Sequence, residues 1–182
     1  MPRKKPPPSQ REVIACTAAH LPAIQAIYND AILKTTALYE YAPRTEAVMQ
    51  EWFATRDRDG IPVLGIEWEP GVLAGFATWG PFRLRAAYKY SAEHSVYVDE
   101  RYRGAGIGRQ LLQAIITAAQ RQGLHTLVAG IDASNVASVA LHSSAGFRCC
   151  GTIRESGFKF GRWLDLEFWQ LILPTPEHPV DG

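Results

Sequence analysis

The spacing of apolar residues changes along the chain, and each change marks an expected element. Two early segments carry apolar residues at helical spacing, and each follows a threonine, Thr17 or Thr45, that can cap a helix. Two β-rich runs, residues 63–68 and 72–79, flank a Glu-Pro-Gly turn and predict a hairpin. Residues 13–14 predict a short first strand ahead of the helices.

The second half of the chain alternates apolar strands with amphipathic helices. A strand at 93–98 runs into a turn with three glycines, and a helix at 109–122 follows and stops at Gly123. The later segments predict a strand at 127–131, a helix at 135–145, and strands at 147–152 and 164–173. The order β-α-α-β-β-β-α-β-α-β-β predicts an α/β fold with a mixed central sheet, antiparallel in its N-terminal half, and a central βαβ unit.

The glycine-rich turn reads Arg103-Gly104-Ala105-Gly106-Ile107-Gly108. Glycines let backbone N–H groups approach a ligand closely, and a helix start adds free donors with a partial positive charge. Such a turn suits a phosphate or pyrophosphate. A Walker loop would end in Gly-Lys-Ser/Thr, and a dinucleotide fingerprint would place a third glycine where Arg109 stands. Taken alone, the turn could also be a plain connection between the strand and the helix, with no ligand.

The charge balance and the length of the chain limit which partners and how many domains we expect. The 182 residues include 19 basic and 18 acidic side chains, so we expect no nucleic-acid or membrane partner. One domain is predicted at 12–174, between a basic proline-rich tail at 1–11 and a C-terminal tail at 175–182. The N-terminal tail lacks the apolar stretch of a secretory signal.

The three cysteines, Cys16, Cys149 and Cys150, have no metal-ligand spacing. Reduced thiols are typical of the cytoplasm, where disulfides are rare. We therefore expect a cytoplasmic protein with no metal site.

The strand, turn and helix around the glycines resemble the pyrophosphate loop of the GNAT family of acyl-CoA N-acyltransferases, whose pattern is Arg-x-x-Gly-x-Gly. That family typically follows its next strand with Asn, a helix and Gly-Phe, and Asn135, Gly146 and Phe147 stand at these positions. A closer resemblance is to the phosphinothricin and methionine-sulfoximine N-acetyltransferases. It is carried by Tyr-Asn-Asp at 28–30, Glu-His-Ser-Val-Tyr-Val at 93–98 and Lys-Phe-Gly-Arg-Trp-Leu-Asp at 159–165.

This resemblance implies a GNAT fold with acetyl-CoA as co-substrate. In the family, the strand before the loop pairs its backbone with the pantetheine arm, and the loop binds the pyrophosphate. The expected cofactor-binding residues are Val96, Tyr97, Val98, Arg103, Gly104, Ala105, Gly106, Ile107, Gly108, Arg109 and Asn135. The side chains at 96–98 could equally be plain core, and helix capping alone would explain Asn135.

Acetyl transfer to an amine needs a neutral nucleophile, so a general base helps at neutral pH. Glu93 is the expected base, because burial in an apolar strand would raise its pKa, and the resembling branch carries its catalytic glutamate here. The alternative is an edge glutamate facing water. His142 stands where many GNAT enzymes place a tyrosine that protonates the leaving thiolate. Its alternatives are lining the thioester pocket or packing under the sheet.

The acceptor is expected to be a small amine that also carries a carboxylate. The loop at 80–90 offers arginines, whose planar fork binds paired oxygens, although this loop could also be merely solvated. The expected acceptor-binding residues are Tyr39, Arg83, Arg85, Glu93, His94 and Ser95. The resemblance also implies a homodimer whose partner helps to close the site.

The sequence therefore predicts an acetyl-CoA-dependent N-acetyltransferase acting on the α-amine of an amino-acid analogue such as L-phosphinothricin, methionine sulfoximine or methionine sulfone. One alternative is a GNAT enzyme acting on a protein N-terminus, a lysine or an aminoglycoside. Another is a CoA-binding sensor without catalysis. No acidic cluster predicts a groove for a peptide or aminoglycoside, and a sensor would need neither Glu93 nor His142.

Overall fold

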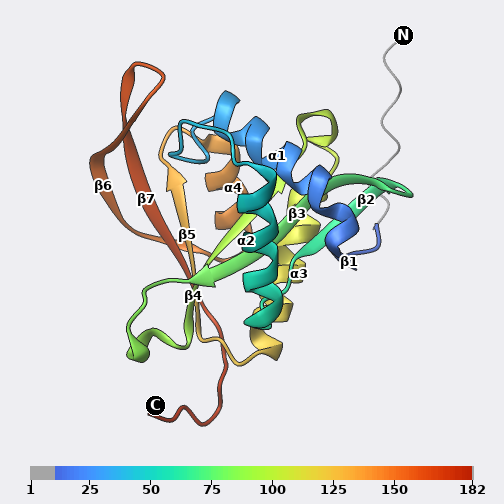
Figure 1. Cartoon of the computed structure of the whole chain (residues 1–182). Helices are drawn as coiled ribbons and strands as arrows, with labels where there is room; N and C mark the ends of the chain where they lie inside the picture. The colour runs from blue at the N-terminus through green and yellow to red at the C-terminus, as the bar shows by residue number, and fades with distance from the viewer. Residues whose placement is uncertain (1–10, 182) are drawn as a thin grey trace.

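One seven-stranded sheet, in the order β1-β2-β3-β4-β5-β7-β6, forms the centre of the computed structural model, which describes residues 11–181. The strands, labelled in Figure 1, are β1 (Ile14–Ala15), β2 (Leu64–Glu69), β3 (Val72–Pro81), β4 (Ser91–Val98), β5 (Thr126–Asp132), β6 (Arg148–Lys159) and β7 (Arg162–Ile172). The helices are α1 (Leu21–Lys34), α2 (Glu46–Arg58), α3 (Ile107–Arg121) and α4 (Val136–Ser144).

The predicted topology is confirmed. Strands β1 to β4 pair antiparallel with their neighbours, and β4 and β5 are parallel and connected through α3. Most of the predicted tail at 1–11 lies outside the described residues. None of the helices in the described part is long and apolar enough to cross a membrane.

Local chemistry sets where the first helices begin. The Thr45 hydroxyl accepts a hydrogen bond from the Val48 backbone N–H at 3.4 Å, so α2 starts at the predicted cap. Thr17 instead precedes a single 3₁₀ turn at Ala18–His20. As a result α1 begins later than the cap at Thr17 indicates.

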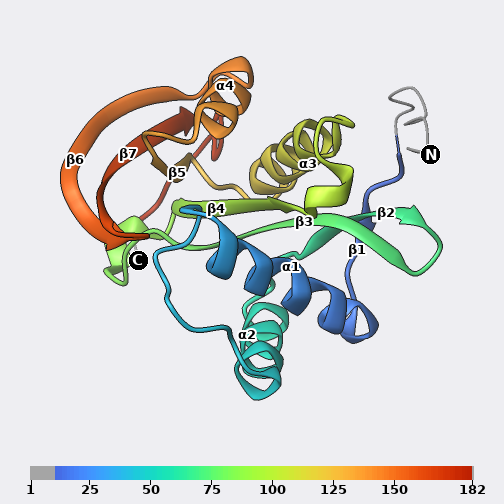
Figure 2. The same ribbon diagram turned by 90° about the horizontal axis from the view of Figure 1, so that it is seen from above.

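Helices cover both faces of the β1–β4 half of the sheet. Figure 2 shows α1 and α2 on one face and α3 on the other. Ile24 and Phe76 are fully buried in the cluster under α1 and α2, and Leu111 and Ile115 are fully buried in the cluster under α3. Each such side chain contributes roughly 1.5–3 kcal/mol on burial. The β3–β4 pair is therefore held firmly from both sides.

The two edges of β4 are paired very differently. One edge pairs with β3 along its whole length, from Val98 opposite Gly75 to Ala92 opposite Pro81. The other edge pairs with β5 only over Ser91, Ala92 and Glu93. Beyond Glu93 the two strands separate, and Figure 2 shows β5, β7 and β6 curving away from the plane of the other strands.

The last two strands are longer than predicted. β6 continues to Lys159 and turns through Phe160 and Gly161, both at positive φ, into β7 at Arg162. Register shifts occur after Cys149 and after Ile153. β6 is largely exposed on both faces, so its residues have no alternation of apolar and polar side chains to predict a strand.

Candidate active site

A cleft of about 1190 Å³ opens where β4 and β5 separate. Two parts of its lining are built differently. The first, the glycine-loop wall, comprises residues 94–104 and 106–109. The second, the hairpin wall, comprises residues 34–37 at the end of α1 and just after it, together with Phe160 and Arg162 from the β6–β7 hairpin. Residues 129–132 of β5 and the cleft-facing side of α4 lie between them.

The glycine-loop wall combines a strand edge, a glycine turn and a helix start. Beyond Glu93, the β4 edge faces the cleft and has no strand partner on that side among residues 11–181. Gly104 and Gly106 have φ values of 75° and 82°, in the left-handed region that favours glycine. Gly106 caps α3 without a side-chain bond, so the first N–H groups of that helix are directed toward the cleft. This arrangement can bind an extended amide chain that ends in a pyrophosphate.

The predicted cofactor residues can now be placed. All of them line the cleft except Ala105, which packs against the core cluster under α3. Asn135 caps α4 by accepting a hydrogen bond from the Ser138 N–H at 3.1 Å, and it also lines the cleft. Arg103 donates a hydrogen bond from Nε to the Val98 carbonyl at 3.3 Å. The predicted residues thus gather around one space.

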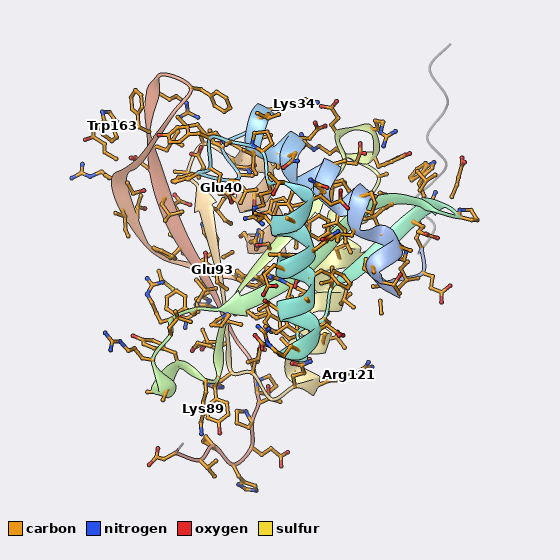
Figure 3. The ribbon with its side chains drawn as sticks, in the orientation of Figure 1. Lys34, Glu40, Lys89, Glu93, Arg121 and Trp163 are labelled. Atoms are coloured by element: carbon orange, nitrogen blue, oxygen red, sulfur yellow. The ribbon has the colours of Figure 1, made fainter. Side chains whose placement is uncertain are left out.

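Glu93 lies at the point where the strands separate, and Figure 3 labels it near the centre of the molecule. Burial raises the pKa of its carboxyl group, and the positive charge of Arg83 opposes this shift. Glu93 is not part of the cleft lining itself. Its Oε1 lies 3.1 Å from where a Cβ on Gly130 would stand, and Gly130 does line the cleft. The half-buried carboxylate therefore lies against a glycine of the cleft lining.

His94 and His142 are both buried, and their Nε2 atoms lie 3.0 Å apart. The Nδ1 atom of His142 lies 2.8 Å from the backbone carbonyl oxygen of Ser138. Burial lowers the pKa of His142, opposed by that carbonyl. Burial and the neighbouring His142 lower the pKa of His94 to about 3, opposed by the backbone carbonyl of Val128. Both rings are therefore neutral at pH 7.

The predicted acceptor residues are not all brought together. Ser95 lines the cleft, and so does His94. The Arg83 guanidinium stacks over Phe82 at 4.4 Å, close enough to influence Glu93, whereas Arg85 is exposed at the start of a 3₁₀ turn. The Tyr39 ring packs against Gly157 of β6, outside the cleft lining. Among these six residues, Glu93, His94 and Ser95 are adjacent on β4.

Lys159 is a structural residue that the sequence does not reveal. Its buried ammonium donates to the carbonyl oxygens of Ile32, Thr35 and Leu38 at 2.6, 2.9 and 2.6 Å. These bonds tie the hairpin to the end of α1 and the loop that follows. No local pattern marks a lysine whose partners are more than 120 residues away. By contrast, a glycine inside a strand, such as Gly130, indicates that another group approaches the backbone closely, and this could have been predicted from the sequence.

Within residues 11–181, no group of three or more His, Cys, Asp or Glu side chains could hold a metal ion. The site instead combines an open strand edge, a helix start with a glycine turn, and a carboxylate of raised pKa.

These features define the class of the protein: it is an acetyl-CoA-dependent N-acetyltransferase, as the comparisons with known proteins bear out. A family model described as Acetyltransferase (GNAT) family matches residues 24–147, so the chain belongs to the GNAT family of acetyltransferases.

Three relatives illustrate the likeness. The chain is 48% identical over 162 residues to an L-methionine sulfoximine/L-methionine sulfone acetyltransferase of Pseudomonas aeruginosa, with 88% of this chain and 94% of the relative covered. A GNAT superfamily phosphinothricin acetyltransferase from Sinorhizobium meliloti, solved in complex with AcCoA, matches with TM-score 0.90 and 34% identity over 94% of this chain and 93% of its own. A ribosomal-protein-alanine N-acetyltransferase from Brucella melitensis matches with TM-score 0.86 and 47% identity over 89% and 99%.

Proposed function

We propose that this enzyme transfers the acetyl group of acetyl-CoA to the α-amine of a small amino-acid analogue such as methionine sulfoximine, methionine sulfone or L-phosphinothricin. Two of the relatives are named for these compounds. The observation that carries the proposal is Glu93, a half-buried carboxylate of raised pKa at the end of the open edge of β4. A base at that point lies where a thioester held along the edge would meet an amine.

Glu93 is the general base in this proposal. The ammonium of the acceptor loses a proton to Glu93, and its nitrogen attacks the thioester carbonyl. The C–S bond then breaks, the nitrogen loses its second proton to form the amide, and that proton passes to the thiolate. His142, whose two ring nitrogens contact His94 and Ser138, would line the thioester pocket rather than supply the proton. A pKa raised by burial brings the carboxylate closer to the range in which it can both accept and release a proton near neutral pH.

Acetyl-CoA would bind along the glycine-loop wall. The backbone of Val96, Tyr97 and Val98 would pair with the amide arm, and the free N–H groups at Ile107, Gly108 and Arg109 would bind the pyrophosphate. The acceptor would lie toward Glu93 and Ser95, with its carboxylate or phosphinate near Arg83. The influence of Arg83 on Glu93 supports this placement.

A thiol-release assay with a panel of amines tests the substrate class. We expect turnover of methionine sulfoximine, methionine sulfone and phosphinothricin, and none of a peptide with an N-terminal alanine. The peptide belongs in the panel because one relative is named a ribosomal-protein-alanine N-acetyltransferase. Turnover of the peptide alone would overturn the proposal. Binding of acetyl-CoA without thiol release from any amine would favour a sensor.

Glu93→Gln tests the base separately, because it keeps the shape of the side chain but cannot accept the proton. We expect kcat/KM to fall by about 10²–10⁴-fold, with little change in the Kd of acetyl-CoA. Glu69→Gln, at an exposed position at the end of β2, is the matched control. An unchanged kcat/KM for Glu93→Gln between pH 6 and 9 would exclude Glu93 as the base.

We also propose that the enzyme is a homodimer. The support is β6, an edge strand that is largely exposed on both faces and carries Ile153 and Phe158 at 52% and 47% exposure. A long exposed edge of this kind is suited to a protein partner. Light scattering after size-exclusion chromatography gives the mass directly, and a monomer of 20.2 kDa would contradict the proposal.

A further inference from the structure

The contact between His94 and His142 joins two elements that are distant in the sequence. His94 comes from β4 and lies next to Glu93, whereas His142 comes from the last turn of α4. Both side chains are only 5% exposed, and their Nε2 atoms are 3.0 Å apart. At this distance one nitrogen carries a hydrogen and the other accepts it.

The partners of the remaining ring atoms decide which nitrogen carries the hydrogen. A carbonyl oxygen can only accept, and the Ser138 carbonyl lies 2.8 Å from Nδ1 of His142, so that Nδ1 carries a proton. In a neutral ring Nε2 of His142 is then bare and must accept from Nε2–H of His94. This leaves Nδ1 of His94 bare. Among the described residues that atom has no hydrogen-bond partner, so the Val128 carbonyl that opposes the lowering of the His94 pKa makes a weaker contact than the 2.8 Å contact between His142 and Ser138.

The opposite arrangement is unfavourable. A proton on Nε2 of His142 would leave Nδ1 bare, with its lone pair directed at the Ser138 carbonyl oxygen 2.8 Å away. The Ser138 hydroxyl, at 3.3 Å from the same Nδ1, is the weaker of the two contacts. The shorter contact therefore fixes the tautomer, and the tautomer fixes which histidine donates.

We propose that His94 is a positioning residue that holds His142 at the cleft as a neutral ring protonated on Nδ1, by donating a hydrogen bond to its Nε2. Because both nitrogens of His142 are engaged, the ring is fixed in orientation as well as in tautomer. His94 thus acts through His142 rather than by touching the acceptor. The catalytic consequence rests on the proposed function, whereas the tautomer does not.

Two variants of similar size separate this role from simple packing. His94→Gln retains an N–H donor that can reach Nε2 of His142, and His94→Met fills the space without a donor. ¹⁵N NMR of the imidazoles in the free enzyme reports which nitrogen of His142 is protonated, with His142→Gln used to assign the signals. Kinetics then follow with the best amine of the panel, and thermal melting checks that each variant is folded.

In the wild type and in His94→Gln we expect the Nδ1–H tautomer of His142, and in His94→Met a mixture. We expect kcat to fall roughly tenfold or more in His94→Met, because a ring free to turn is misplaced, with a smaller change in the KM of acetyl-CoA. His94→Gln should recover most of this loss. A wild-type His142 protonated on Nε2 would overturn the proposal even if His94→Met did not fold. Equal kcat in the Met and Gln variants would do the same.

The two possible failures are distinguishable. If no amine in the panel is acetylated, the proposed function fails, but the tautomer measured in the free enzyme still decides the role of His94. If an amine is acetylated and the tautomer is not as assigned, the proposal for His94 alone is wrong.

Discussion

The two walls of the cleft are built in opposite ways. The glycine-loop wall comes from one continuous segment, residues 94–109, in which a strand edge, a glycine turn and a helix start follow one another. The hairpin wall comes from residues 34–37 and from Phe160 and Arg162, which are held together by the three hydrogen bonds of Lys159. The first wall is therefore specified locally, whereas the second exists only when distant parts of the chain meet.

This contrast predicts different consequences of substitution. Changes in the glycine-loop wall should alter cofactor binding beyond what their local cost in stability explains. Changes in the hairpin wall should alter stability first, because its few buried polar contacts hold separate segments in place. The following substitutions test this difference, beginning with the largest expected effect.

Replacement of Lys159 by methionine should have the largest effect. It removes three hydrogen bonds from a buried ammonium and leaves the carbonyl oxygens of Ile32, Thr35 and Leu38 short of a donor. We expect the free energy of unfolding to fall by about 3 kcal/mol, measured by urea denaturation. Arg154→Met is the control, because Arg154 is an exposed cation on the same strand. Equal losses in the two variants would show that Lys159 does not hold the hairpin wall together.

Gly106→Val should affect the glycine-loop wall. Gly106 has φ 82°, so valine is strained there by about 1–2 kcal/mol, and its side chain would stand at the start of α3, where the pyrophosphate is proposed to bind. Gly123→Val is a matched control, because Gly123 has φ 72° at the other end of α3 with nothing within 4 Å of an added Cβ. Both variants should lose similar stability, but only Gly106→Val should raise the KM of acetyl-CoA, by about tenfold. A similar rise in both would mean that backbone strain alone is responsible.

The same contrast explains how much could be predicted from the sequence. The order of elements along the chain, the glycine turn and the cap at Asn135 depend on neighbouring residues, and the structure has them where the patterns indicate. The extension of β6 was missed because its exposed residues do not alternate. The bonds of Lys159 and the partner of His94 were missed because each joins residues at least 48 positions apart. These features depend on burial and on long-range contacts, and the spacing of apolar residues along the chain does not indicate either.

Gly130→Ala probes the point where Glu93 lies against the cleft lining. An added Cβ would stand 3.1 Å from Oε1 of Glu93 and 3.4 Å from Cδ1 of Leu166, so the carboxylate must shift. We expect kcat/KM to fall by about tenfold, since a small displacement of a catalytic group is costly. Gly80→Ala is the control, because Gly80 pairs with Glu93 from β3 and has nothing within 4 Å of an added Cβ. Unchanged activity of Gly130→Ala would place the reacting amine away from Gly130.

The smallest expected effect is a difference in how stability depends on pH. Because burial lowers the pKa of His94 to about 3, the unfolded chain binds a proton between about pH 6.5 and pH 3 that the folded protein does not. Stability must therefore fall as the pH falls through this window, by at most about 1.4 kcal/mol per pH unit for one group. His94→Gln removes this term, whereas the opposite contribution of Glu93, whose pKa is raised, remains in both proteins. The free energy of unfolding, measured by urea denaturation at pH 7, 6 and 5, should thus fall faster with falling pH in the wild type than in His94→Gln. The two plots of this free energy against pH should converge as the pH falls. Parallel curves would show that His94 takes up its proton in the folded protein, and the buried pair would then carry a charge.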